Sequence, residues 1–141
     1  MDNEVKIQLL SKSVNESYAR VAVASFAAQL DPTVSEINDI KTAVSEAVTN
    51  CIVHAYKEEV GKIYITVSIE GRTVKIKVRD RGCGIENVKK AMEPMFTTGG
   101  EDRAGLGFAV MQSFMDKLLV RSTPGRGTTV TMYKTVSARL R

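Results

Sequence analysis

Apolar and polar residues alternate along three segments of the chain, residues 4–11, 63–70 and 74–79. This period of two is typical of β-strands that bury one face. The last two segments flank the turn sequence Glu-Gly-Arg at 70–72. They therefore predict a hairpin with one face in water.

Two helices are predicted between the first and second strands, where apolar residues recur every three or four positions. The sequence Ser-Val-Asn-Glu at 13–16 fits a capping box and would open a helix that ends near residue 30. Thr-Val-Ser-Glu at 33–36 fits a second capping box, and its helix would continue to about residue 56.

The segment 80–106 is rich in glycine and predicts at most one short helix, over 87–92. A long segment with so little regular structure is usually functional. A helix over 107–117 and strands over 118–123 and 128–136 complete the chain. This order of elements predicts an α/β (α+β) two-layer sandwich, in which a mixed, mainly antiparallel sheet is covered on one face by helices.

Composition favours one ordinary globular domain over residues 1–141, because 43% of the residues are hydrophobic and 26% are charged. Cys51 and Cys83 are too few for a disulfide framework and predict a reduced, cytoplasmic chain. The acidic N-terminus does not resemble a signal peptide, and no apolar stretch is long enough for a membrane span. We therefore expect no membrane partner.

The net charge of +4 and the pI of about 9.1 permit an acidic partner without requiring one. Binding to nucleic acid through charge needs clustered cations, preferably with aromatic residues among them. The basic residues here are scattered along the sequence, which contains four Phe, four Tyr and no Trp. We expect no direct nucleic-acid partner, although a nucleic-acid-binding domain remains an alternative, with steeply salt-dependent affinity.

Glu46, Asn50 and His54 are spaced by four and would form one row on the second helix. A polar outer face is the simplest explanation of Glu46 alone. A carboxylate one turn from an amide would alternatively provide a general base beside an oxygen ligand for Mg²⁺. For His54, packing or hydrogen bonding is favoured over catalysis.

Asp80 continues the inward-facing row of the strand at 74–79 and would be buried. A buried carboxylate requires hydrogen-bond donors. Gly82 and Gly84 follow it and would let the backbone approach another group closely. The segment is either an Asp-Gly turn or an acceptor for the exocyclic amine of a base such as adenine, with Thr128 on the same side.

A second glycine-rich cluster, from Thr97 and Thr98 to Gly105, Leu106 and Gly107, immediately precedes the predicted helix at 107–117. Backbone amides at a helix N-terminus bind phosphate well. The cluster therefore predicts the phosphate end of a nucleotide site.

Arg20 is the only charged residue between Glu16 and Asp31, on a helix that is apolar over more than one stripe. It indicates either an interface with a protein partner or an arginine that snorkels from a buried helix.

The order of four motifs, Glu-x-x-x-Asn, Asp-x-Gly-x-Gly, Gly-Leu-Gly and Gly-Thr, resembles the GHKL (Bergerat) superfamily of ATP-binding domains. This superfamily includes gyrase, a heat-shock chaperone, histidine kinases and a mismatch-repair ATPase. The sequence Glu-Ala-Val-Thr-Asn-Cys-Ile-Val-His-Ala-Tyr at 46–56 is similar to the anti-sigma-factor serine kinases. Met-Glu-Pro-Met-Phe-Thr-Thr at 92–98 and the compact length make the sporulation anti-sigma F factors the nearest resemblance.

The resemblance implies roles for these residues. Asn50 would bind Mg²⁺ between the phosphates of ATP or ADP, and Glu46 would be the catalytic base. Asp80 would accept the adenine amine, aided by Thr128. The remaining cofactor-binding positions would be Gly82 and Gly84 at the base, and Thr97, Thr98, Gly105, Leu106 and Gly107 at the phosphates, with residues 88–104 as a lid.

The resemblance also implies partners and an activity. The chain would bind sigma F as a homodimer with ATP. Arg20, indicated by its apolar surroundings rather than by the resemblance, is the expected partner-binding residue. It would phosphorylate a serine of an anti-anti-sigma factor, which frees the sigma factor. The alternative is a nucleotide-gated binding module without phosphotransferase activity, and Glu46 argues against it.

Overall fold

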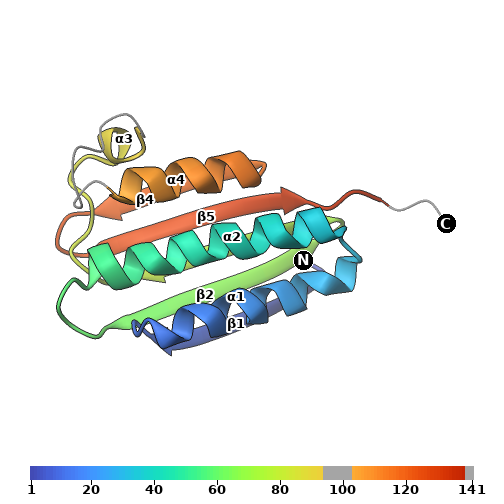
Figure 1. Cartoon of the computed structure of the whole chain (residues 1–141), viewed down its shortest axis with the longest axis horizontal. Helices are drawn as coiled ribbons and strands as arrows, with labels where there is room; N and C mark the ends of the chain where they lie inside the picture. The colour runs from blue at the N-terminus through green and yellow to red at the C-terminus, as the bar shows by residue number, and fades with distance from the viewer. Residues whose placement is uncertain (94–102, 139–141) are drawn as a thin grey trace.

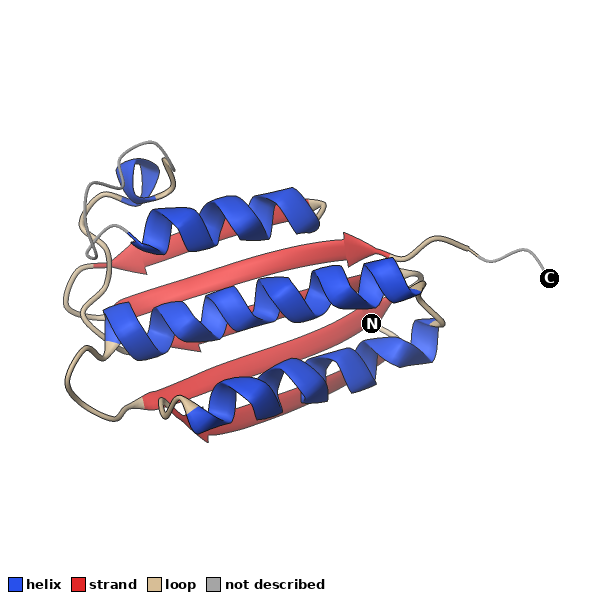
Figure 2. Cartoon of the chain, in the orientation of Figure 1, coloured by secondary structure: helices blue, strands red, loops and turns tan. Residues whose placement is uncertain are grey.

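Five antiparallel strands form one sheet in the computed structural model. The helices α1 (Val14–Ala27), α2 (Val34–Asn50) and α4 (Arg103–Phe114) lie across one of its faces (Figures 1 and 2). The structure describes residues 1–93 and 103–138. The strands follow the order β1-β2-β3-β5-β4. Their bounds are β1 Asn3–Leu10, β2 Lys62–Glu70, β3 Thr73–Asp80, β4 Lys117–Thr123 and β5 Gly127–Thr135.

The expected two-layer α+β architecture is confirmed, and the sheet, expected to be mixed and mainly antiparallel, is antiparallel in the described chain. Each of the four strand pairs in the described chain runs antiparallel. The central strand β3 pairs with β2 on one side and with β5 on the other, through Ile76 opposite Val67 and Met132. All three side chains are buried under the helices. The pairing registers of neighbouring strands therefore place their inward-facing residues side by side in one core.

Helix α1 (Val14–Ala27) continues into a 3₁₀ turn at Ala28–Leu30. The predicted capping box at its start is wrong, since the Ser13 side chain accepts no capping hydrogen bond. The carboxylate of Glu16, which the box would require, binds Arg20 instead at 3.0 Å. The second capping box is confirmed at α2 (Val34–Asn50), where Thr33 and Glu36 bond reciprocally.

The last turn of the predicted second helix is a π-helix, Cys51–Ala55. The wider turn changes the side-chain spacing after Asn50, so the regular row of four ends there. Single π turns are rare and often occur at functional sites. Farther along the chain, α3 spans Val88–Ala91 and α4 spans Arg103–Phe114. Helix α4 thus starts before the predicted residue 107.

No helix in the described residues has the length and hydrophobicity needed to cross a bilayer.

The chain after β5 is fixed to the start of α2. Glu36 accepts hydrogen bonds from the amides of Thr33 and Ser137, both at 2.8 Å. Arg72 adds bonds to the carbonyls of Leu30 and Ser137, each at 2.8 Å. Although burial alone would raise the pKa of Glu36, these amides and the Thr33 and Ser137 hydroxyls lower the pKa to about 2.

We predict that Glu36→Gln lowers the free energy of unfolding at pH 7 by about 1 kcal/mol, because the amides of Thr33 and Ser137 lose an anionic acceptor. A carboxyl with a lowered pKa stabilises the fold above its unfolded pKa, and this contribution disappears as the pH falls toward 2. Urea unfolding between pH 7 and pH 2 should therefore show the two proteins converging below pH 4.5. A constant difference across this range would contradict the assignment.

Candidate functional site

The end of β3 carries a buried carboxylate, as the alternation predicted. Asp80 is 6% exposed. Its Oδ1 accepts hydrogen bonds from the amides of Gly82 at 2.9 Å and Thr128 at 3.2 Å. Two strands and the loop after β3 therefore meet at one oxygen atom.

Burial raises the pKa of Asp80, and the hydrogen bonds from Gly82, Thr128 and Cys51 oppose this rise. Within the described chain, Oδ2 accepts one hydrogen bond, from the thiol of Cys51 at 3.6 Å. A carboxylate oxygen has room for a further donor. Oδ2 is thus the atom that can accept an amine from a ligand.

Cys51 is a site residue that the sequence pattern did not reveal, because its periodic position marked it only as apolar. Burial, followed by the charge of nearby Asp80, raises the pKa of Cys51 well above its ordinary value. The thiol stays protonated and remains a donor. In the sequence, only its position directly after Asn50 could have indicated that Cys51 belongs to the site.

The loop after β3 is held between the π-helix and the β4–β5 turn. Cys83 donates from its amide to the carbonyl of Ala55 at 3.0 Å, and the amide of Gly125 donates to the carbonyl of Cys83 at 2.7 Å. A Cβ on Gly82 would collide with the backbone of Ala55, and one on Gly84 with the backbone of Thr123. Both glycines were expected to make room for a ligand, but their contacts within the protein already require them.

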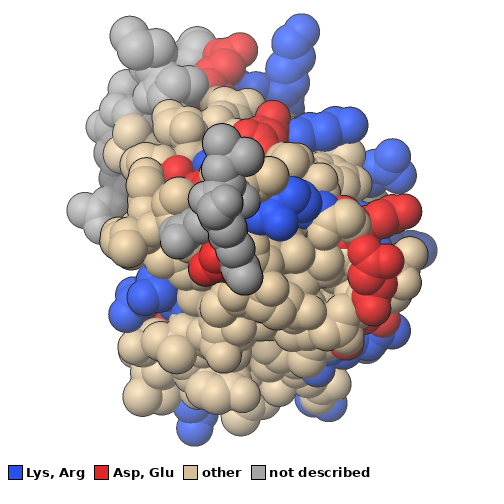
Figure 3. All heavy atoms as spheres, turned by 90° about the vertical axis from the view of Figure 1, so that its right-hand side faces the viewer, with Lys and Arg blue, Asp and Glu red and all other residues tan. Residues whose placement is uncertain are grey.

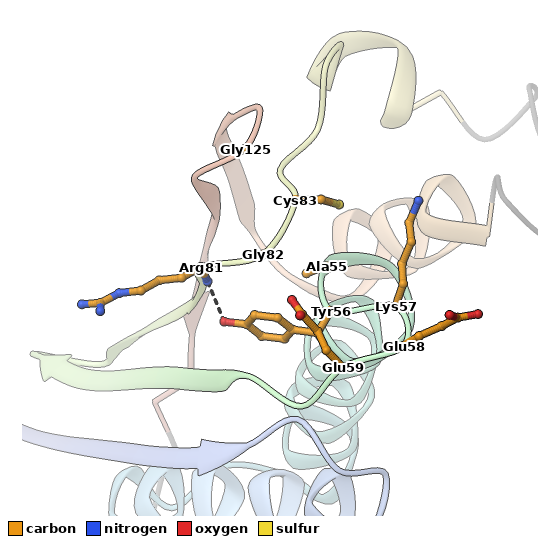
Figure 4. Close-up of a pocket in the computed structure, with 9 residues that line it drawn as sticks. All are labelled: Ala55, Tyr56, Lys57, Glu58, Glu59, Arg81, Gly82, Cys83 and Gly125. Carbon is orange, nitrogen blue, oxygen red and sulfur yellow. Dashed lines mark hydrogen bonds between the residues drawn. The ribbon is translucent and has the colours of Figure 1, made fainter.

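Tyr56 fixes the end of the π-helix to the sheet. Its hydroxyl donates to the carbonyl of Lys62 at 2.6 Å. The same hydroxyl accepts a hydrogen bond from the amide of Arg81 at 2.7 Å (Figure 4). Beside it lies an open pocket of about 540 Å³ whose walls include Lys57 and Gly82. Asp80 and Asn50 are not among its lining residues, so the predicted chemistry lies elsewhere.

A second, more enclosed cavity of about 50 Å³ brings predicted residues together. Asn50, His54, Asp80, Gly84 and Thr128 all line it. Its apolar walls include Ile85, Phe108 and Val130. Ligand pockets usually exceed about 300 Å³, so a bound nucleotide would extend beyond this cavity.

Thr128 is oriented by Ser122, a partner that the sequence did not indicate. The Ser122 hydroxyl accepts the amide of Ile85 at 2.7 Å and donates to the carbonyl of Gly127 at 3.0 Å. A hydroxyl has one hydrogen to donate. Thr128 must therefore donate across their 2.8 Å contact, which leaves the Thr128 oxygen as an acceptor toward the cavity.

Glu46 and Asn50 meet α4 at Gly107. A Cβ on this glycine would lie 3.2 Å from both Glu46 Oε2 and Asn50 Oδ1. The predicted base and the predicted metal ligand thus flank one point on the helix. Asn50 Nδ2 is buried and has no hydrogen-bond partner within the described residues, and a buried polar atom of this kind needs a partner such as a water molecule, an ion or a ligand.

The residues present fit a nucleotide with Mg²⁺. Among the described residues, no group of three His, Cys, Asp or Glu side chains could hold a metal alone. Mg²⁺ is commonly bound through one or two protein oxygens together with substrate phosphates. Asn50 supplies such an oxygen through Oδ1, and the orphaned Nδ2 suits a phosphate oxygen.

The phosphate cluster differs in part from its predicted setting. Gly105, Leu106 and Gly107 lie inside α4 rather than before it, because the helix already begins at Arg103. Thr97 and Thr98 fall outside the described residues. Leu106 is 49% exposed, whereas Gly107 is buried.

Arg20 lies on α1, away from the cavity. Its side chain is 37% exposed and bonds Glu16 at 3.0 Å and Ser45 at 3.4 Å. Tyr18 and Val21 beside it are exposed by 60% and 56%.

Comparison with known proteins identifies the family of this site. The profile of the histidine kinase-like ATPase domain matches residues 10–134. The chain is 60% identical to an anti-sigma F factor from Caldanaerobacter subterraneus subsp. tengcongensis, with 94% of each chain covered. It is 58% identical to one from Thermoanaerobacter sp. (strain X514), with 96% of each covered. The chain belongs to the anti-sigma F factor family.

Solved structures agree with this family at the level of the fold. The RsbU and RsbW domains of Rv1364c from Mycobacterium tuberculosis match 99% of this chain at 22% identity, with a TM-score of 0.72, and the match covers 33% of that chain. The catalytic domain of histidine kinase ThkA matches 95% of this chain and 96% of its own at 17% identity, with a TM-score of 0.60. The GHKL-type fold is confirmed. As a histidine kinase-like ATPase domain, this anti-sigma F family member binds nucleotide.

We predict that Gly107→Ala lowers ATP affinity about tenfold or more while the melting temperature is unchanged or higher. Alanine favours a helix by about 1 kcal/mol over glycine, but the added methyl would displace the oxygens of Glu46 and Asn50. Calorimetric titration and thermal melting together check this. Unchanged ATP affinity in a folded variant would show that α4 does not border the nucleotide.

Proposed function

We propose that this chain is an ATP-dependent protein serine kinase that also binds and inhibits a sigma factor, sigma F. Its phosphate acceptor would be a serine of an anti-anti-sigma factor. The observation that carries the proposal is the meeting of Glu46, Asn50 and Gly107 at one point, beside a cavity that Asn50 lines together with buried Asp80. Relatives named anti-sigma F factor support the sigma-factor role.

The Asp80 end selects the base. Adenine carries an exocyclic amine, which would donate to Oδ2, while the Thr128 oxygen accepts a second donor or a bridging water. Guanine carries a carbonyl at the corresponding position, and its oxygen would be repelled by the carboxylate oxygen. This chain is therefore expected to bind ATP or ADP rather than a guanine nucleotide.

The Glu46 end performs the transfer. The Glu46 carboxylate takes the proton from the attacking serine hydroxyl. The serine oxygen forms a bond to the γ-phosphorus while the bond between the γ-phosphorus and the β-phosphate oxygen breaks, and ADP is released. Asn50 would hold Mg²⁺ through Oδ1 and a phosphate through Nδ2. When bound, the ion neutralises the phosphate charge that develops during transfer.

The exposed face of α1 is the proposed protein-binding surface. Val14, Tyr18 and Val21 are exposed at helical spacing, with Arg20 beside them. Arginine and tyrosine are enriched at interface centres. We propose Arg20 as a partner-binding residue, and that the active form is a homodimer.

A nucleotide-gated binding module without transferase activity would need Asp80 and Asn50 but not Glu46. Replacing Glu46 therefore separates the two functions.

Glu46→Gln should retain ATP binding and lower phosphotransfer to the anti-anti-sigma protein by about 10²- to 10⁴-fold, the usual cost of a lost general base. Single-turnover assays with labelled ATP measure this rate. Thr42→Ala, one turn earlier on α2, serves as the control and should leave the rate unchanged. An undiminished rate in Glu46→Gln would favour another base, and no transfer by the wild type would favour the binding module.

Asn50→Ala should weaken ATP binding much more with Mg²⁺ than with a chelator, because the lost amide oxygen is the proposed ligand of the ion. Nucleotide titrations under both conditions provide the comparison. An equal loss in both would indicate a packing defect.

Arg20→Glu should weaken binding to sigma F or to the anti-anti-sigma protein by about tenfold or more, while ATP affinity and melting temperature change little. Its ion pair with Glu16 is partly exposed, and such pairs contribute little stability. Lys77→Glu, on the sheet face away from the helices, matches the charge change. Surface plasmon resonance measures both affinities. Unaltered affinity of Arg20→Glu for both partners would show that Arg20 does not lie in the interface.

A further inference from the structure

The sheet face away from the helices gathers basic residues that are scattered in the sequence. Alternation points every second strand residue to this face, and the registers align them across the sheet. We call it the basic sheet face. Its strand residues include two acids, Glu4 and Glu70, and seven cations: Lys6, Lys62, Lys75, Lys77, Arg79, Lys117 and Arg121.

The positive charge is densest at the centre of the sheet. Lys75, Lys77 and Arg79 alternate along β3, which is paired on both sides. Lysines often protect the edge strands of a sheet against unwanted pairing. A central strand needs no such protection, so the edge rule does not explain these residues. Figure 3 views the molecule from the right of Figure 1 and shows Lys and Arg side chains projecting from its right-hand side, with Asp and Glu side chains between them.

Two tyrosines lie among these cations. The Lys75 and Lys117 ammonium groups lie 5.8 and 5.6 Å from the centroid of the Tyr133 ring. Arg79 and Arg81 lie 5.4 and 5.0 Å from the Tyr64 ring. Cations beside aromatic rings are the pattern by which open sheets bind single strands, since bases stack on the rings while phosphates pair with the cations.

The basic sheet face also contains two neighbouring depressions that could hold a nucleic-acid strand. A shallow depression of about 360 Å³ is lined by Lys75, Lys77, Arg121 and Tyr133, together with Thr129 and Thr131. A neighbouring depression of about 290 Å³ also includes Lys75 and Tyr133. Threonine hydroxyls donate hydrogen bonds to phosphate and sugar oxygens without reading sequence.

We infer that the basic sheet face binds single-stranded nucleic acid with little sequence preference. The expectation of no direct nucleic-acid partner rested on scattered basic residues, and the strand registers remove that premise. An acidic protein surface would satisfy the cations but gives no role to the tyrosines. The face is separated from the Asp80 cavity by the thickness of the sheet, so binding does not require ATP.

Fluorescence anisotropy with a labelled single-stranded oligonucleotide of about twelve nucleotides tests the inference. Lys75→Gln with Lys77→Gln should lower the magnitude of the slope of log affinity against log salt by about 1.4, and the affinity about tenfold or more at ~0.1 M salt. Lys12→Gln with Lys57→Gln removes the same charge elsewhere and should change the slope much less. Tyr133→Leu should weaken binding about fivefold or more with the slope unchanged.

Thermal melting of each variant confirms that it is folded. Absence of binding by the wild type, or equal losses in both double variants, would overturn the inference. Polyglutamate that binds as tightly as the oligonucleotide, with no effect of Tyr133→Leu, would assign the face to an acidic protein instead.

Discussion

The arrangement of the elements around the candidate site depends on the hydrogen bonds to the buried carboxylate of Asp80. Its Oδ1 joins the loop after β3 to β5 through the amides of Gly82 and Thr128. The thiol of Cys51 joins it to the π-helix. Burying a carboxylate costs several kcal/mol unless donors surround it, so these elements must meet here for the fold to tolerate the residue. The same donors leave Oδ2 able to accept a ligand.

Several unusual local features follow from this constraint. The π-helix places Cys51 against Asp80 and keeps His54 on the cavity wall. Gly82 and Gly84 are required where the loop passes between the π-helix and the β4–β5 turn. The elements around Asp80 are therefore held in place by backbone contacts, so the proposed base-binding end would need little reorganisation by a nucleotide.

The alternation of strands and the spacing of helices predicted the layers and the inward position of Asp80, because both follow from local periodicity. The start of α4 was missed because glycines weaken the helical signal at Gly105 and Gly107. Cys51 and Ser122 were missed because their roles depend on contacts between segments distant in sequence. The clustered cations of β3 were missed for the same reason, since charge counted along a chain does not show which side of a sheet it occupies.

Measurement of the Asp80 pKa by carbon-detected NMR, with and without ATP, tests the central claim most directly. In the free chain, burial should hold this pKa above its ordinary value. Adenine binding should lower it, because an amine that donates to Oδ2 favours the charged form. GTP should not lower it. An Asp80 pKa that is unchanged or raised by saturating ATP would contradict the account.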